Sequence, residues 1–335
     1  METAAHSSPL LLSRYPRSLR RRILFLIVGD ALLLAFVLSF AARNPDSTVL
    51  REMTSIANNA APVLLAGLGL TGIVFTGAID LSIGAILAVA GTVFGICYSH
   101  GIGPGPSFIA CFSAALALSA FNGLLVRLLK VPAIIVTLAG LTFYRGMALI
   151  LADSVVADFG GQFSILNEAY RVPGRDYAGA ILIVTSLATL LWEWSGRLPR
   201  TWLALGNSET SCRLKGWSPG RILQSAFAAG GCFLGLAAVT FVTNLQTIEP
   251  TRIARNFELD VIGGVVLGGT NIFGGEGSFL GTLLGGLFLY LVGQTMIYAG
   301  ISEYWRTAVQ GAVILAVIGI DCALHKKQKR LEELR

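Results

Sequence analysis

Apolar runs of about 20 residues recur along almost the whole chain, and this feature limits the folds open to it more than any other. A helix needs about 20 apolar residues to cross the ~30 Å hydrocarbon core of a bilayer. Hydrophobic residues make up 54% of the 335 residues and charged residues only 13%, against about 25% charged in soluble domains. The pattern predicts an all-α polytopic membrane protein and excludes a soluble enzyme.

Glycines, prolines and charged clusters divide these runs into about ten candidate transmembrane helices. The expected spans are 23–42, 56–76, 81–99, 107–129, 131–152, 178–194, 221–243, 261–275, 279–298 and 305–323. They define a transmembrane domain over residues 23–324, between a basic N-terminal segment at 1–22 and a C-terminal tail at 325–335. The first apolar stretch continues to about Ala42 without a clear cleavage site, so we expect a retained helix and not a signal peptide.

Lysines and arginines are distributed unevenly between the loops. With the N-terminus inside, 17 of the 25 fall on the cytoplasmic side and six on the opposite side, while Arg145 and Arg306 lie within spans. Because cytoplasmic loops of membrane proteins carry an excess of these residues, both termini are predicted to be cytoplasmic, which requires an even number of crossings. The net charge of +6 therefore reflects membrane orientation and implies no nucleic-acid partner.

Two glycine-rich stretches, 67–91 and 263–286, differ from plain lipid-facing helix. Each follows an apolar run, breaks at Gly and polar residues, and resumes as a helix of small residues. Non-helical backbone at membrane depth must be buried in protein or line a cavity, and paired interruptions point to a transport pathway. The GxxxG spacing, as in Gly264 with Gly268, is equally typical of close helix packing. The two interpretations are compatible.

A few polar residues in the predicted spans are candidates for a substrate pathway, because an ionisable group inside a membrane is costly unless it is paired or hydrated. Asp80 lies with Ser82 at the first break, where the carboxylate could instead cap the next helix. Arg145 could line a polar cavity or extend toward the membrane surface. Asn122 and Thr137 could bind a hydroxylated solute or a neighbouring helix.

Sequence motifs for enzyme or cofactor chemistry fail in this chain. Residues 216–220 spell GxSxG, but a hydrolase elbow needs a preceding strand, and Pro219 suits the first turn of the next span instead. The glycine-rich run at 268–277 lacks the lysine of a P-loop. The five cysteines form no CxxC pair and the three histidines lie far apart, which argues against a metal site. We expect this chain to bind no cofactor.

The most informative polar segment is a basic loop over residues 195–220, between two predicted spans. Asn207 or Ser208 could cap a short helix that carries Glu209 and Arg213 at positions i and i+4. Such an exposed helix could dock on a partner, although a merely solvated loop would have the same composition.

Five segments, taken in order, resemble the permeases of ABC importers of the ribose, xylose, arabinose and galactose type. They are GAIDLSIGAILAVAG (77–91), VPAIIVTLAGLTFYRG (131–146), ALGNSETSCRLKGW (204–217), FELDVIGGVVLGGTNIFGGEGSFLGTLLGG (257–286) and EYWRTAVQGAVILAVIGID (303–321). The resemblance implies a bacterial inner-membrane permease that forms a homo- or heterodimer. Its implied partners are cytoplasmic ATP-binding subunits, which carry ATP and Mg, and a periplasmic sugar-binding protein.

The same resemblance identifies residues 204–217 as the cytoplasmic coupling stretch that seats in a groove on the ATPase. The positions that keep the family's pattern are Gly206, Glu209, Arg213, Leu214 and Gly216. Asn207 and Lys215 depart from it, since the family usually has Gly and Ser there, and Ala78 stands where a second Gly is usual.

The leading hypothesis is the permease subunit of an ABC importer for a monosaccharide, with alternating access driven by ATP hydrolysis on partner chains. The alternative is an ion-coupled secondary transporter of a small polar solute, in which Asp80 and the glycine-rich breaks would supply a cation site. Dependence of uptake on ATP or on an ion gradient distinguishes the two. The motifs do not specify the sugar, because relatives with different cargo share them.

Overall fold

The computed structural model describes residues 15–43, 48–152, 157–158, 177–245, 247–250 and 252–302, with scattered positions between 305 and 319. Within these ranges the chain is almost entirely helical, as predicted. The helices are α1 (Arg17–Ala41), α2 (Val49–Phe75), α3 (Ile83–Ser99), α4 (Pro104–Leu129), α5 (Ala133–Ala152), α7 (Tyr177–Ser195), α8 (Arg197–Asn207), α9 (Glu209–Leu214), α10 (Pro219–Thr243), α11 (Phe257–Leu267) and α12 (Phe279–Tyr298). A two-residue antiparallel pair, β1 (Ala157–Asp158) with β2 (Thr247–Ile248), joins two loops.

Seven helices of the described residues are long and apolar enough to cross a membrane, namely α1, α2, α4, α5, α7, α10 and α12. The shorter α3 is also apolar. Most predicted spans match the observed helices within a few residues, although α2 begins seven residues earlier than expected. The last predicted span, 305–323, lies only partly within the described residues and the tail at 325–335 lies outside them, so the count of ten stays a prediction.

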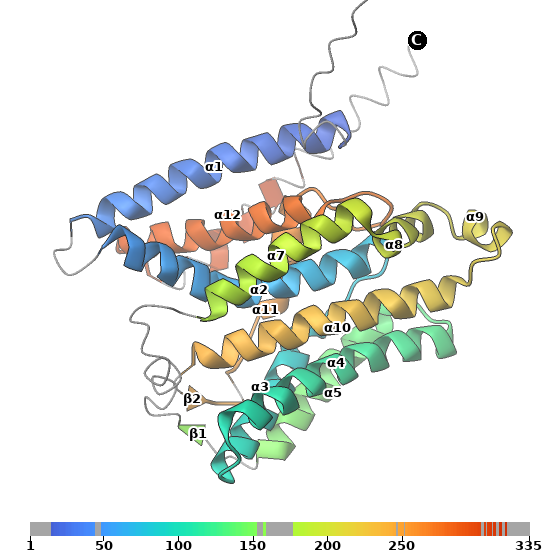
Figure 1. Ribbon diagram of the computed structural model, residues 1–335, viewed down its shortest axis with the longest axis horizontal. Helices are drawn as coiled ribbons and strands as arrows, with labels where there is room; N and C mark the ends of the chain where they lie inside the picture. Colours follow the sequence, from blue (N-terminus) through green and yellow to red (C-terminus); the bar gives the residue numbers. More distant parts are fainter. Residues whose placement is uncertain are drawn as a thin grey trace, which may run out of the picture.

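Helix α2 occupies the centre of the bundle, and most of its residues are buried in protein. It packs along α10, α7, α11 and α12, and α10 in turn packs along α4 (Figure 1). Small residues permit the close approach: Gly69 of α2 lies against the backbone of Gly230 in α10. In contrast, α1, α5 and α7 expose many large apolar side chains, which is expected of surfaces that face lipid.

Hydroxyl side chains and a proline set several helix starts. Thr48 accepts a hydrogen bond from the Arg51 N–H (3.2 Å) at the start of α2. Ser278 does the same for the Gly281 N–H (3.3 Å) at the start of α12. Pro219 lies in the first turn of α10, as predicted, where its missing N–H costs nothing.

Both predicted interruptions are present. Helix α2 ends at Phe75 and α3 begins at Ile83, with non-helical backbone between them. The predicted helix over 261–275 is wrong in its C-terminal half, because α11 ends at Leu267 and a turn over residues 268–278 follows.

The glycines of the second interruption both break the helix and allow close helix packing, the two interpretations considered from the sequence. Gly274 and Gly275 have positive φ angles of 88° and 81°, which glycine adopts freely and other residues only with strain. On the flanking helices, Gly264 of α11 lies against the backbone of Gly286 in α12. The segment therefore combines a break in the helix with close packing of its two sides.

Candidate functional site

The loop over residues 195–220 folds into two short helices, α8 and α9, and α9 protrudes at one end of the bundle (Figure 1). Of the two caps considered, Ser208 is the one used: its hydroxyl accepts a hydrogen bond from the Ser211 N–H (3.1 Å). Glu209 and Arg213 form the expected i,i+4 ion pair at 2.5 Å with both side chains largely exposed. The short helix predicted for this loop is therefore present.

Leu214 ends α9 with its side chain 85% exposed. An apolar side chain exposed to water has a higher free energy than the same side chain buried against another protein. Gly216 follows with a positive φ of 76° and turns the chain back toward α10. Leu214 is thus presented outward at a hydrogen-bonded turn.

Trp202 holds α8 against the bundle and is almost completely buried. Its indole N–H donates a hydrogen bond to Ser225 Oγ in α10 (2.9 Å). The ring packs edge-to-face on Trp192 of α7, with 5.3 Å between ring centroids. It also covers Gly72 of α2, where a Cβ would collide with it. One side chain therefore ties α8 to three membrane helices.

The backbone at the end of α8 contacts both glycine-rich breaks. A Cβ on Gly206 would collide with the Phe75 carbonyl oxygen and the Gly275 nitrogen, and these two groups are hydrogen-bonded to each other (3.1 Å). Asn207 adds a hydrogen bond from Nδ2 to the Gly275 carbonyl oxygen (3.0 Å). Asn207, which stands where the family usually has Gly, thus makes a hydrogen bond that Gly could not make.

Gly77 and Gly274 complete this contact. Gly274 lies against the backbone of Gly77 and the Cα of Gly206, and both Gly77 and Gly274 have positive φ. We call Gly77, Gly206, Gly274 and Gly275 the glycine junction. No side chain separates the three backbone segments where they meet.

Four of the five predicted pathway residues come together in a buried network between the start of α3 and helices α4 and α5. Asp80 Oδ1 accepts hydrogen bonds from the Ser82 N–H (2.8 Å) and the Ser82 hydroxyl (2.6 Å). Asn122 Nδ2 donates to Ser82 Oγ (2.8 Å). Thr137 Oγ1 donates to the Ile79 carbonyl oxygen (3.1 Å). The sequence named these residues without showing that they form one network.

Tyr144 is the member that sequence reasoning missed; its hydroxyl donates a hydrogen bond to Asn122 Oδ1 (2.7 Å). It lies seven residues after Thr137, about two helical turns, so both side chains occupy one face of α5. Asp80, Asn122 and Thr137 are 0% exposed, and Asp80 Oδ2 has no hydrogen-bond partner within the described part of the chain. In this conformation the network connects helices, and a contact with solute stays a prediction.

Replacing Asn122 with alanine is expected to lower the free energy of unfolding by about 2 kcal/mol, because the buried Ser82 and Tyr144 hydroxyls would both lose a partner. Denaturant titration of the permease in lipid bicelles measures this. Tyr144→Phe removes one donor and should cost less, about 1 kcal/mol. Equal stability of Asn122→Ala and the wild type would show that the network contributes nothing.

Arg145, the fifth predicted pathway residue, lies apart from this network. Its guanidinium donates hydrogen bonds to the carbonyl oxygens of Ile253 (2.6 Å) and Ala254 (3.2 Å). These oxygens belong to the turn before α11, in which Ala254 and Asn256 have positive φ angles of 50° and 62°. Such an angle is strained in Ala254, which carries a Cβ, whereas asparagine tolerates it better. Arg145 therefore holds a strained turn in place.

Comparison with known proteins assigns the chain to a family. Residues 52–318 match the family described as branched-chain amino acid transport system / permease component. The chain belongs to this family of transport permeases. The ribose import permease RbsC of Bacillus subtilis (strain 168) is 30% identical over 81% of this permease and 85% of the relative. The autoinducer 2 import system permease LsrC of Escherichia coli (strain K12 / DH10B) is 29% identical over 85% and 84%.

A solved structure shares the fold of this permease. A metal-chelate type ABC transporter in an inward-facing conformation has a TM-score of 0.52 and covers 91% of this chain and 99% of its own. At 12% identity the likeness shows the fold alone. The resemblance to monosaccharide ABC permeases is confirmed by the family and its relatives, and the permease is a multi-pass membrane protein.

Proposed function

We propose that this permease is the membrane subunit of a binding-protein-dependent ABC importer for a monosaccharide, either a ribose-like pentose or a hexose. The observation that carries the proposal is α9, which stands outside the bundle while its neighbour α8 touches both helix breaks. The relatives import ribose and autoinducer 2, which favours a small hydroxylated solute. ATP and Mg would bind the partner ATP-binding subunits, since the chain has no P-loop lysine.

In the proposed mechanism α9 seats in a groove on the ATP-binding subunit, and ATP-driven closure of two such subunits moves it. Trp202 and the glycine junction pass this movement to the end of α2 and to the turn over 268–278. Packed backbones transmit displacement because they have no void to absorb it. Tilting of the two bundles then opens a central path to the opposite side, as alternating access requires.

The proposed assembly contains two permease subunits, alike or different, in the bacterial inner membrane. A periplasmic sugar-binding protein delivers the solute with high affinity, because a tight site within the path would slow release. The charge distribution supports cytoplasmic termini. The domain over 23–324 would then lie between a cytoplasmic segment at 1–22 and a cytoplasmic tail at 325–335.

Reconstitution in liposomes tests the proposal. We expect the complex of permease, ATP-binding subunits and sugar-binding protein to accumulate labelled monosaccharide only with ATP on the side of the ATP-binding subunits. A matched complex with a hydrolysis-deficient ATP-binding subunit is the control and should show no uptake. Uptake by the permease alone along a sodium or proton gradient would overturn the proposal and favour the ion-coupled alternative.

A further inference from the structure

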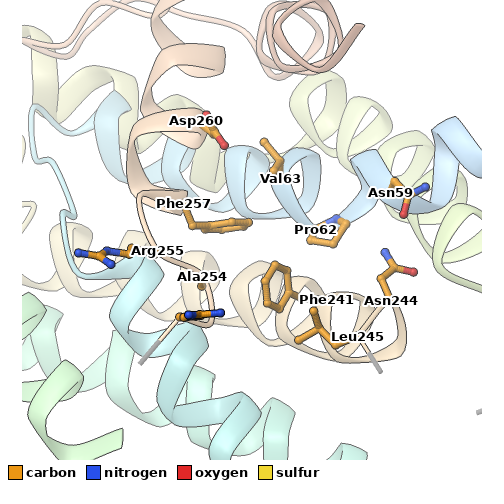
Figure 2. Close-up of a pocket in the computed structure, with 11 residues that line it drawn as sticks. Asn59, Pro62, Val63, Phe241, Asn244, Leu245, Ala254, Arg255, Phe257 and Asp260 are labelled. Carbon is orange, nitrogen blue, oxygen red and sulfur yellow. The ribbon is translucent and has the colours of Figure 1, made fainter. Parts of the chain in front are cut away.

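A cavity of about 350 Å³ lies where the middle of α2, the end of α10 and the start of α11 meet (Figure 2). It lies at the far end of α10 from α9, because α10 begins just after α9 and its last turn adjoins the cavity. Small-molecule sites usually measure about 300–1,000 Å³. The volume therefore suits a solute of monosaccharide size better than a large one.

The side chains that line the cavity are of two kinds. Phe241 of α10 and Phe257 of α11 pack edge-to-face, with ring centroids 5.7 Å apart, and form an apolar wall. Asn59, Asn244 and the charged residues of the α11 turn surround this wall (Figure 2). An aromatic surface accepts the C–H face of a sugar ring, and planar amides and charged groups bond its hydroxyls. The sequence hides this set because its members come from three separate segments: α2, the end of α10 with the residues after it, and α11 with the turn before it.

Both amides are held in place by neighbouring groups. Asn244 Nδ2 donates to the Asn58 carbonyl oxygen (2.9 Å), and Asn59 Nδ2 donates to Ser55 Oγ (3.2 Å). Neither amide oxygen has an assigned hydrogen-bond donor among the described residues. Polar side chains fixed in this way near an aromatic wall reduce the entropy that a hydroxylated ligand must overcome on binding.

The charges around the cavity distinguish between classes of solute. Arg252 pairs with Glu249 at 3.5 Å, and Arg255 shares the cavity lining with Asp260. Two of these groups are cations and two are carboxylates, counting Glu249, which pairs with Arg252 but does not line the cavity. The four charges together therefore give no preference to an anion. A neutral polyhydroxylated solute fits this lining better than a sugar phosphate or a sugar acid.

The cavity is also connected to the glycine junction. Ala254 lines it, and Arg145 holds the carbonyl oxygen of that strained residue. Helix α11 starts at the cavity with Phe257 and ends at Leu267, directly before the turn that contacts Gly206. At 1.5 Å per residue the two ends are about 16 Å apart, so one short helix joins the cavity to the coupling segment.

We propose that this cavity is a low-affinity acceptor site for one neutral monosaccharide ring. The proposal rests on the proposed function, because an importer receives its solute at the face opposite the ATP-binding subunits. A dissociation constant in the millimolar range is expected, since the solute must leave the site again during each cycle.

Saturation-transfer NMR on the permease alone in nanodiscs tests this site without ATP or any partner. The probes are D-ribose, D-xylose and D-galactose at about 10 mM, some tenfold above a millimolar dissociation constant. We expect transfer to the ring protons of at least one probe. Arg255→Gln and Asn244→Ala should each reduce it about fivefold, as loss of one hydrogen bond implies. Arg51→Gln is the matched control, an exposed arginine of α2 outside the cavity lining, and should change nothing.

Three results would overturn the acceptor site: no transfer to any probe, equal transfer in Arg255→Gln and the wild type, or displacement of the sugars by D-gluconate at lower concentration. Unchanged melting temperatures show that the variants are folded. The two proposals fail separately. ATP-driven uptake without sugar transfer in the NMR experiment overturns the acceptor site alone, whereas sugar transfer without ATP-driven uptake overturns the importer function alone.

Discussion

Replacing Gly206 with alanine is expected to reduce ATP-driven uptake by at least about 100-fold. The added Cβ would collide with two backbone atoms, the Phe75 carbonyl oxygen and the Gly275 nitrogen, and backbone cannot rotate away as a side chain can. Relief requires α8 to move off the bundle and the Gly275–Phe75 hydrogen bond to open, at a cost of about 3 kcal/mol. Uptake into liposomes, measured together with the ATP hydrolysis rate, should show hydrolysis without transport.

Gly146→Ala is the control for this substitution, because a Cβ at Gly146 meets no atom within 4 Å. Asn207→Ala is a milder test that removes only the side-chain hydrogen bond to the Gly275 carbonyl oxygen, and uptake should fall a few-fold. Normal uptake by Gly206→Ala would show that the glycine junction does not transmit movement from the coupling segment.

Replacing Leu214 with aspartate is expected to weaken binding of the ATP-binding subunit by about 100-fold. If α9 seats in a groove, Leu214 is its apolar anchor, and aspartate would bring an unpaired carboxylate into the interface. The side chain is 85% exposed in the permease alone, so the melting temperature should not change. Titration of labelled permease with the purified ATP-binding subunit measures the dissociation constant.

Leu214→Met keeps the apolar contact and should bind like the wild type. Glu209→Gln and Arg213→Gln are also expected to reduce docking, but by less, because each breaks only an exposed ion pair that stabilises α9 by about 0.2–0.5 kcal/mol. Equal affinities of Leu214→Asp and the wild type would place the docking surface elsewhere on the permease.

Local patterns in the sequence predicted the membrane helices, because crossing a bilayer requires a length of apolar chain that can be counted. A cap at Asn207 or Ser208, the Glu209–Arg213 pair and Pro219 in a first turn were equally predictable, since each depends on neighbours within four residues. The end of α11 at Leu267, inside the helix predicted over 261–275, was not predictable from such local patterns. There Gly274 and Gly275 adopt left-handed conformations that composition permits but does not demand.

The residues of the candidate site could likewise be predicted from the sequence, but their contacts could not. Asp80, Ser82, Asn122 and Thr137 were predicted as polar residues at membrane depth, but their common network and the part of Tyr144 in it appear only when α3, α4 and α5 pack together. The role of Arg145 was missed because its acceptors lie more than 100 residues away in the chain.

From the amino-acid sequence alone it follows that this chain crosses a membrane many times, breaks its helices at two glycine-rich stretches and presents a capped helix between two spans. These properties follow from hydrophobicity and local geometry. The folded arrangement of the helices was needed to show that α8 touches both breaks through Gly206 and that Phe241 and Phe257 form the wall of a cavity at the far end of α10. Both arrangements join residues distant in sequence, and packing of helix surfaces, not local pattern, selects such neighbours.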